Sequence, residues 1–218
     1  MGKRLNAILL LILSVLLSFG TGCAYFGGLA ISGKAGTLGL GGELTRKVTS
    51  NINTRFGINA LNFDMEGEIE DIEYDVGVDF LSYSALLDWH VFNGSFRISG
   101  GALVIQNEIS LDLRLTDSLT IGDTEYDPDE IGTLSGNIGF EGVAPYLGIG
   151  WGNALTRNKR WGFTTDFGVA FTGAPDVALS STGSVSQADL DIEKANIEDD
   201  LSFLTVSPVI SFGLFYKF

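Results

Sequence analysis

The chain has 218 residues, with 27 acidic against 13 basic residues and a net charge of −14. So acidic a chain is unsuited to nucleic acid, because phosphate contacts need Lys and Arg. Its single cysteine and single histidine exclude an intrachain disulfide framework, a Cys-based metal site and a multi-His metal site. Mean hydropathy is +0.25, with 29 Gly, 4 Pro and 18% charged residues, which indicates a transmembrane β-barrel, where only the lipid face of each strand must be apolar.

The N-terminus predicts export through a secretory signal. Lys3 and Arg4 precede an apolar stretch, Ala7–Leu17, that is too short to cross a bilayer as a helix. Cleavage after Ala24 gives a signal peptide at 1–24 and a barrel domain at 25–218, whose net charge is −16 once Lys3 and Arg4 are removed. A lipobox at 20–23, with Cys23 lipidated, is a second interpretation that the sequence leaves open.

Seven later segments show the period-two alternation of strands, and they are separated alternately by short and long connections. They span 34–46, 51–63, 73–90, 95–113, 138–152, 160–173 and 203–218. A bacterial single-chain barrel has an even strand number, so we expect an eighth strand at 25–31, before a turn at Ser32-Gly33. The predicted fold is an all-β, antiparallel up-and-down transmembrane barrel of eight strands, with ten as the alternative if 174–200 also crosses.

Two of these segments change the parity of their apolar residues. In 73–90 the change falls near Leu81, and in 95–113 it falls at Gly100-Gly101. A β-bulge shifts the parity by one residue, and glycine is common at such sites. The sequence therefore predicts one bulge near Leu81 and another at Gly100-Gly101.

The connections predict how the barrel lies in its membrane. Those at 46–50, 91–94 and 153–159 are short, whereas those at 64–72, 116–137 and 173–200 are long and mostly acidic. Outer-membrane barrels have short periplasmic turns and long extracellular loops. Trp89, Trp151 and Trp161 cluster at the short-turn end with Phe92, Tyr216 and Phe218, as an interfacial aromatic girdle does. The last long loop is open to two interpretations, a helix capped by Ser186 or an irregular acidic loop.

Large apolar side chains facing lipid leave charged ones facing the interior. The charged set comprises Glu43, Arg55, Asp88, His90, Arg97, Asp166 and Lys217. All but Asp166 lie close to the short turns, so one ion-pair cluster is expected in that half of the lumen. Eight strands enclose little more than side chains, and buried charges need partners. We expect the cluster to close the barrel; a path for protons or ions is the alternative.

Two other groups suggest chemistry only weakly. His90 is the only base for a serine nucleophile, but it belongs to the short-turn end, away from the outer leaflet where an acyl hydrolase works. The acidic run from Asp123 to Glu130 lacks the Gly and Glu of a calcium loop, which are Pro128 and Leu134 here. Asp127-Pro128 fits a helix N-cap better, although weak Ca²⁺ or Mg²⁺ binding stays open. We predict no catalytic residue, no metal site and no cofactor.

The C-terminus ends in alternating apolar residues and a terminal aromatic: Ile210, Phe212, Leu214, Tyr216 and Phe218. This pattern resembles the signal that the outer-membrane barrel assembly machinery reads, and 144–152 with 160–163 resembles a strand-turn-strand of small Gram-negative barrels. Residues 28–218 thus resemble the OmpA/OmpX-like superfamily. The resemblance implies insertion by that machinery, a monomeric barrel and no cofactor. No OmpA-type periplasmic domain follows, so peptidoglycan anchoring is not implied.

The function expected from these features is that of a non-enzymatic protein of the cell outer membrane, porin-like in fold, with a structural or surface-interaction role. Its expected partners are outer-membrane lipid and lipopolysaccharide. Three alternatives stay open: a small-solute channel, an outer-membrane lipid-modifying enzyme, and a soluble periplasmic barrel that binds an apolar ligand.

Overall fold

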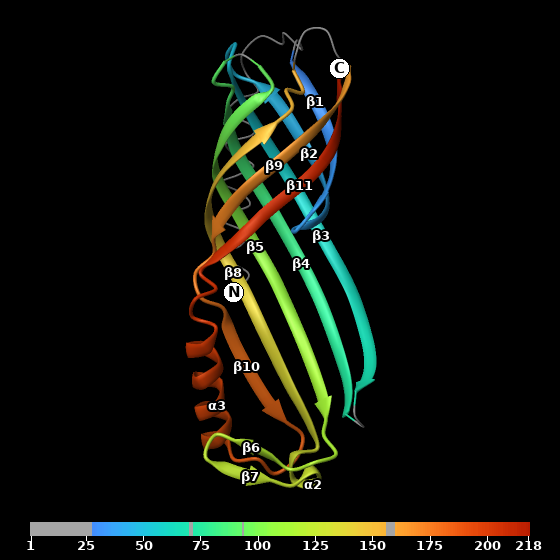
Figure 1. Cartoon of the computed structure of the whole chain (residues 1–218), viewed down its shortest axis with the longest axis vertical. Coiled ribbons are helices and arrows are strands. Elements are labelled where there is room, and N and C mark those ends of the chain that lie inside the picture. The colour runs from blue at the N-terminus through green and yellow to red at the C-terminus, as the bar shows by residue number, and fades with distance from the viewer. Residues whose placement is uncertain (1–27, 70–71, 93, 156–159) are drawn as a thin grey trace, which may run out of the picture.

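The fold is a tall antiparallel barrel with unequal walls (Figure 1). The computed structural model describes residues 28–69, 72–92, 94–155 and 160–218; the predicted signal peptide and Cys23 lie outside them. Four strands are short: β1 (Leu29–Gly36), β2 (Gly39–Lys47), β9 (Trp161–Phe171) and β11 (Val206–Lys217). Four are long: β3 (Ile52–Ile69), β4 (Ile72–Trp89), β5 (Phe96–Arg114) and β8 (Thr133–Trp151).

These eight strands close on themselves. The sheet runs β8-β5-β4-β3-β2-β1-β11-β9, and β9 pairs again with β8. A ninth strand, β10 (Asp176–Ser181), pairs with the β8 residues farthest from the short turns. The predicted eight-stranded up-and-down barrel is therefore confirmed, and the alternative of ten is wrong. In the part of the chain that the structure describes, no helix is long and apolar enough to cross a bilayer.

The position of the first strand differs from the prediction. Ser32-Gly33, the predicted turn, lies in the middle of β1, and the chain reverses at Thr37-Leu38, where Gly36 and Gly39 face each other. Gly39 has φ of +93°, which other residues adopt at a cost. The predicted strand 34–46 therefore combined the end of β1, a two-residue turn and β2.

Neither predicted bulge exists. β4 pairs with β3 and β5 in one unbroken register, from Trp89 opposite Ile98 to Glu73 opposite Arg114 on the β5 side. Leu103 and Ile105 are buried on the same parity as Arg97 and Ser99. The change of pattern arises because the interior itself changes from polar to apolar along these strands, so a bulge was the wrong explanation.

The regions predicted as long loops are largely ordered. β3 and β4 stay paired as far as Ile69 and Ile72, so most of 64–72 is hairpin. The connection between β5 and β8 holds β6 (Leu119–Ile121), β7 (Thr124–Tyr126) and α2 (Pro128–Ile131). The connection between β9 and β11 holds β10 and α3 (Gln187–Asp200), the helix that Ser186 caps by accepting a hydrogen bond from the Asp189 N–H.

The outer surface of the barrel is apolar from the short-turn end as far as one level, where the outward side chains become polar. On the four long strands, the last apolar side chains facing outward are Ala60, Leu81, Val104 and Val143. The next outward residues are Asn62, Asp79, Gln106 and Glu141, and cross-strand pairing joins Asn62 to Asp79 and Gln106 to Glu141. The long strands have 18 or 19 residues and the short ones 8 to 12. At about 3.3 Å per residue, the long strands therefore continue past the short ones by roughly 20–35 Å.

Candidate functional site

The short-turn half of the lumen holds a buried ion-pair network of three cations and three anions. Six strands each contribute one member: Lys34, Glu43, Arg55, Asp88, Arg97 and Asp166. All except Lys34 are almost fully buried. Because positive and negative charges balance, the network leaves no net charge in a low-dielectric interior, where an unpaired charge is very costly.

Arg55 is the centre of this network. Its Nε lies 2.6 Å from Asp88 Oδ2, its Nη1 3.2 Å from Glu43 Oε2, and its Nη2 3.1 Å from Asp166 Oδ1. Asp166 also accepts from Arg97 Nη2 at 2.7 Å and from Lys34 Nζ at 3.1 Å. A planar guanidinium with several fixed donors suits such multiple bridging.

Neutral groups complete the network. Ser99 Oγ donates to Asp88 at 2.6 Å and accepts from Arg55 Nη2 at 3.1 Å. Arg97 also donates to the Gly152 carbonyl and to Thr164 Oγ1. The network therefore links strands on opposite sides of the barrel and fixes their mutual position.

The structure brings five of the seven predicted lumen residues together and adds Lys34. Ala30, Ser32 and Lys34 share the interior face of β1. The sequence did not predict Lys34 as a lumen residue, because the predicted turn at Ser32-Gly33 interrupted this alternation. His90 is buried beside the network and bonds neutral groups: Nδ1 donates to the Gly94 carbonyl at 3.1 Å, and Nε2 accepts from Asn53 Nδ2 at 3.0 Å. Lys217 lies on the inward parity of β11, near the short-turn end.

An apolar layer crosses the lumen above the ion-pair network. Its buried residues come from five strands: Leu86, Leu103, Ile105, Ala144, Tyr146, Ala170 and Val209. The Tyr146 ring has room because β8 and β9 carry glycines beside it; a Cβ at Gly168 would lie 2.5 Å from the Tyr146 hydroxyl. A cavity of about 30 Å³ between Lys34, Asp166 and Tyr146 is large enough for one or two waters.

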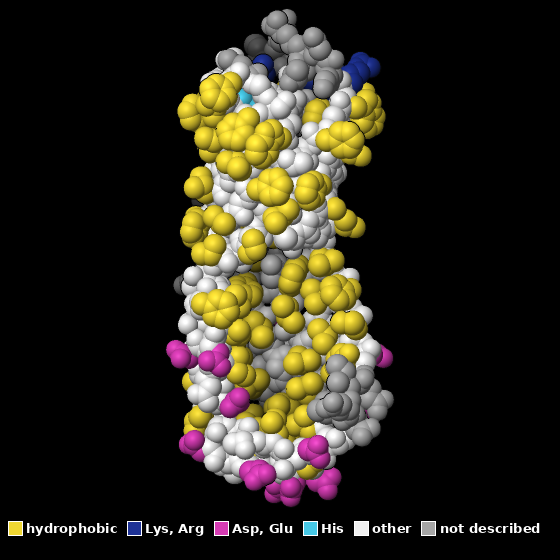
Figure 2. All heavy atoms as spheres, viewed as in Figure 1, with side chains coloured by type: hydrophobic (Ala, Val, Ile, Leu, Met, Phe, Trp, Pro, Cys, Tyr) yellow, Lys and Arg dark blue, Asp and Glu magenta, His cyan; other side chains and the backbone are white. Residues whose placement is uncertain are grey.

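Beyond the apolar layer the long strands form a cup with reversed polarity. We use this name for the part of β3, β4, β5 and β8 that begins at the level of Leu61 and Phe80, together with β10 and the segments that cap it. Apart from Asn107 of β5, the side chains of the long strands that face inward here are apolar or are glycines. The apolar ones, with two from β10, are Leu61, Phe63, Met65, Tyr74, Val76, Val78, Phe80, Ile109, Leu111, Leu113, Leu134, Ile138, Phe140, Val177 and Leu179. Figure 2 shows this apolar lining in a hollow that opens on the side of the short strands.

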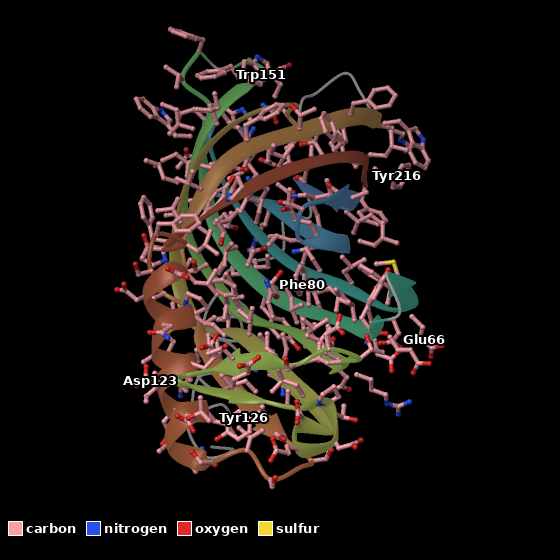
Figure 3. All side chains as sticks on the ribbon, turned by 60° about the horizontal axis from the view of Figure 1, so that its bottom comes forward. Glu66, Phe80, Asp123, Tyr126, Trp151 and Tyr216 are labelled. Atoms are coloured by element: carbon pink, nitrogen blue, oxygen red, sulfur yellow. The ribbon has the colours of Figure 1, made fainter. Side chains whose placement is uncertain are left out.

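The far end of the cup is closed by a cap, which consists of β6, β7, α2 and α3. Ile121, Ile131 and Leu190 form a buried cluster, which packs against Leu134 and Leu179 of the cup. Tyr126 donates to Asp189 Oδ2 at 2.6 Å and so joins β7 to α3. In the view of Figure 3, Phe80 lies between Glu66 at the margin of the cup and Asp123 on the cap. The middle of the inner face stays open, with Phe63 44% and Met65 51% exposed.

Charge is divided sharply between barrel and cup. The segments 62–79, 106–141 and 174–205 carry 24 of the 27 acidic residues but only two basic ones, Arg114 and Lys194. The other three acids are Glu43, Asp88 and Asp166 of the ion-pair network. The convex face of the cup even places Glu66, Asp75 and Asp112 directly opposite one another on adjacent strands, an unfavourable arrangement for like charges.

The acidic run of the cap forms ordered structure. Asp127 begins α2, with Pro128 in its first turn, and its backbone N–H donates to Glu130 Oε2 at 3.1 Å. Among the described residues, no three His, Cys, Asp or Glu side chains are arranged to hold a metal ion.

Aromatic side chains gather on the outer surface at the short-turn end. Trp89, Trp151 and Trp161 are each about half exposed or more, and Phe92 is 82% exposed. Trp161 packs on Tyr216, which in turn meets Phe218 edge-on. Ile210, Phe212 and Leu214 alternate outward along β11. These placements match an interfacial position; the role of the C-terminal residues in assembly stays a prediction.

A closed eight-stranded barrel with an apolar outer belt and a filled interior is the fold of small outer-membrane proteins, and this confirms the expected barrel fold. No protein-family model matches the sequence, and no curated protein matches it. Among solved structures, the chain is similar to CarO2 of Acinetobacter baumannii, with 20% identity over 87% of this chain and 98% of that one and a TM-score of 0.62. CarO of the same organism has 21% identity over 88% of this chain and 98% of that one, with a TM-score of 0.62. The structure of Neisserial surface protein A has 13% identity over 87% of this chain and 93% of that one, with a TM-score of 0.34.

Proposed function

We propose that this protein is a non-conducting outer-membrane barrel with a surface-interaction role, in which the barrel anchors the cup outside the cell and the cup binds an amphipathic ligand on its concave face. The observation that carries this proposal is the reversal of polarity past Asn62 and Asp79. An apolar inner face above the membrane belt has no function in anchoring, and exposed apolar surfaces of this kind mark binding sites.

The lumen argues against the channel alternative. A solute would have to pass the six-membered ion-pair network and then the apolar layer around Leu103 and Tyr146. Breaking such a network leaves buried charges without partners, which costs about 3–5 kcal/mol. We therefore propose that the network closes and braces the barrel.

An enzymatic role has little support in the geometry. Both ring nitrogens of His90 already have partners, and neither partner is a serine hydroxyl. His90 also lies at the end of the barrel opposite the cup, so it does not reach a ligand bound there. Insertion by the barrel assembly machinery and contact with lipopolysaccharide remain proposals that follow from the barrel type.

Two measurements on the reconstituted protein test this function. In planar bilayers we expect no conductance steps from the wild-type chain. With the neutral apolar probe N-phenyl-1-naphthylamine we expect saturable binding that Phe63→Ser weakens, because Phe63 lines the cup, and that Asp64→Ser leaves unchanged, because Asp64 is its neighbour on the convex face. Regular conductance steps, or equal binding by both variants, would contradict the proposal.

A further inference from the structure

The open inner face of the cup and the charge around it specify the ligand further, provided that the cup binds a ligand as proposed above. We infer that the ligand is a cationic amphiphile, a molecule with an alkyl or aryl body and a positively charged group. Its apolar body lies on the concave face, and its cation lies at the margin of the cup near Glu66 and Asp75.

The apolar part of the site is built from neighbouring strands. Phe63 and Met65 of β3 lie opposite Val78 and Val76 of β4, and Val78 lies opposite Ile109 of β5. All five are on the inner face, and the first two are about half exposed. The cap covers Leu134 and Leu179 but leaves this row free. The row therefore offers a contact for an apolar chain without any rearrangement of the cap.

The open side of the cup also determines how such a ligand arrives. It faces the side of the short strands (Figures 1 and 2). The last outward residues of these strands at this end include Leu40, Phe171 and Val206. The apolar belt of the barrel thus meets the opening directly. An amphiphile at the membrane surface can pass from the belt to the inner face without leaving an apolar path.

The charge decides between cationic, neutral and anionic amphiphiles. With 24 acidic and two basic residues in its segments, the cup has a strongly negative field. The row of Glu66, Asp75 and Asp112 stands one sheet thickness from the inner face, a distance comparable to the screening length of about 8 Å at physiological salt. Asn107 adds a buried Oδ1 on the inner parity of β5 that has no hydrogen-bond partner in the described part of the chain. Both features place negative charge or partial negative charge near the inner face, so they favour a cation and disfavour an anion.

The chain carries its own reporter for this inference. Met65 is the only methionine after Met1, and it lies on the inner face. Protein labelled with ¹³C at the methionine methyl group is reconstituted in phospholipid nanodiscs and titrated with dodecyltrimethylammonium, dodecyl sulfate and dodecyl maltoside below their micelle concentrations. These probes share one alkyl chain and differ in charge.

We expect the Met65 methyl signal to shift saturably, with dodecyltrimethylammonium binding about tenfold more tightly than dodecyl maltoside at low salt and the difference shrinking as salt rises. The double variant Glu66→Gln/Asp75→Asn should reduce this preference and leave maltoside binding unchanged. Equal affinities for the three probes, or tighter binding of dodecyl sulfate, would overturn the cationic assignment while the proposed binding function stands. No Met65 shift with any probe would contradict both.

Discussion

Arg55 shows how a single residue determines the stability of the barrel. Its guanidinium contacts Glu43, Asp88 and Asp166, and its side chain is 3% exposed. Removal of the cation leaves three carboxylates with less than their full compensation in a buried site. The cost of an unpaired buried charge, and the balance of three cations with three anions, make Arg55 the least replaceable member.

We expect Arg55→Met to lower the free energy of unfolding by about 3–5 kcal/mol, because the methionine fills the space but not the charge. Urea unfolding of the protein in lipid vesicles measures this loss. The matched control is Arg114→Met on the cup, whose ion pair with Glu73 is two-thirds exposed and should contribute less than about 1 kcal/mol. Equal losses in the two variants would show that the lumen network is not what stabilises the barrel.

Asp189 is the residue through which pH acts on the cap. The hydrogen bond from Tyr126, followed by that from Ser186, holds the pKa of the Asp189 carboxyl below its usual range. A carboxyl with a lowered pKa stabilises the folded cap above its unfolded pKa, and this contribution disappears as pH falls through the folded pKa. Tyr126→Phe should therefore raise the pKa of Asp189 towards its ordinary value, with an NMR titration of the carboxyl carbon as the measurement. An unchanged titration in Tyr126→Phe would mean that this hydrogen bond does not form.

At the scale of elements, the strands change their environment along their length. Residues on one parity of β8 face outward throughout, yet Leu147 is in the apolar belt whereas Glu141 is past it. Along one strand, the outward-facing residues are thus apolar within the belt and polar beyond it. This explains why the sequence predicted strands correctly but attributed the change of pattern in β4 and β5 to bulges.

The belt predicts a depth-dependent cost for a charge. Leu147→Arg should destabilise the barrel by about 2–4 kcal/mol, because a charge near the middle of a lipid face is poorly solvated, whereas Glu141→Arg should cost about 1 kcal/mol or less. Unfolding in vesicles with urea compares the two variants. Similar values for both would place the membrane boundary somewhere other than between Val143 and Glu141.

Alternation determined most of what could be predicted about the elements. Period two predicted seven strands, and the even strand number of bacterial barrels required the eighth. Parity selected Glu43, Arg55 and Asp166 as lumen residues. Asp88 and Arg97 also lie in the lumen, although their assignment assumed bulges that the structure does not contain. Alternation did not locate the turn at Thr37-Leu38, because Ser32-Gly33 is the stronger local turn signal and the pairing of β1 with β11 overrides it. The cup could not be predicted from the sequence. On its strands the outward side chains are acidic and the inward ones apolar, and this reversal gives the same sequence pattern as a bulge that shifts the alternation by one residue.

In the whole molecule, two layers of side chains close the lumen of the barrel, and the inner face of the cup beyond them stays open. The ion-pair network and the apolar layer fill the lumen, and the cup extends beyond them on four long strands and β10. Figure 2 shows the surface acids of this face gathered at the cup end, while large hydrophobic side chains lie towards the opposite end. This polarity suits a protein that stands in an outer membrane with its cup towards the exterior.

The most direct test of this account is the labelling of intact cells with a membrane-impermeant maleimide. Asn137→Cys places a thiol on the exposed convex face of the cup, and Val48→Cys places one at a short turn, where Val48 is 58% exposed. The unsubstituted chain gives the background from Cys23. The account predicts that Asn137→Cys is labelled on intact cells and Val48→Cys only after lysis. The reverse result would place the cup in the periplasm and contradict a surface role.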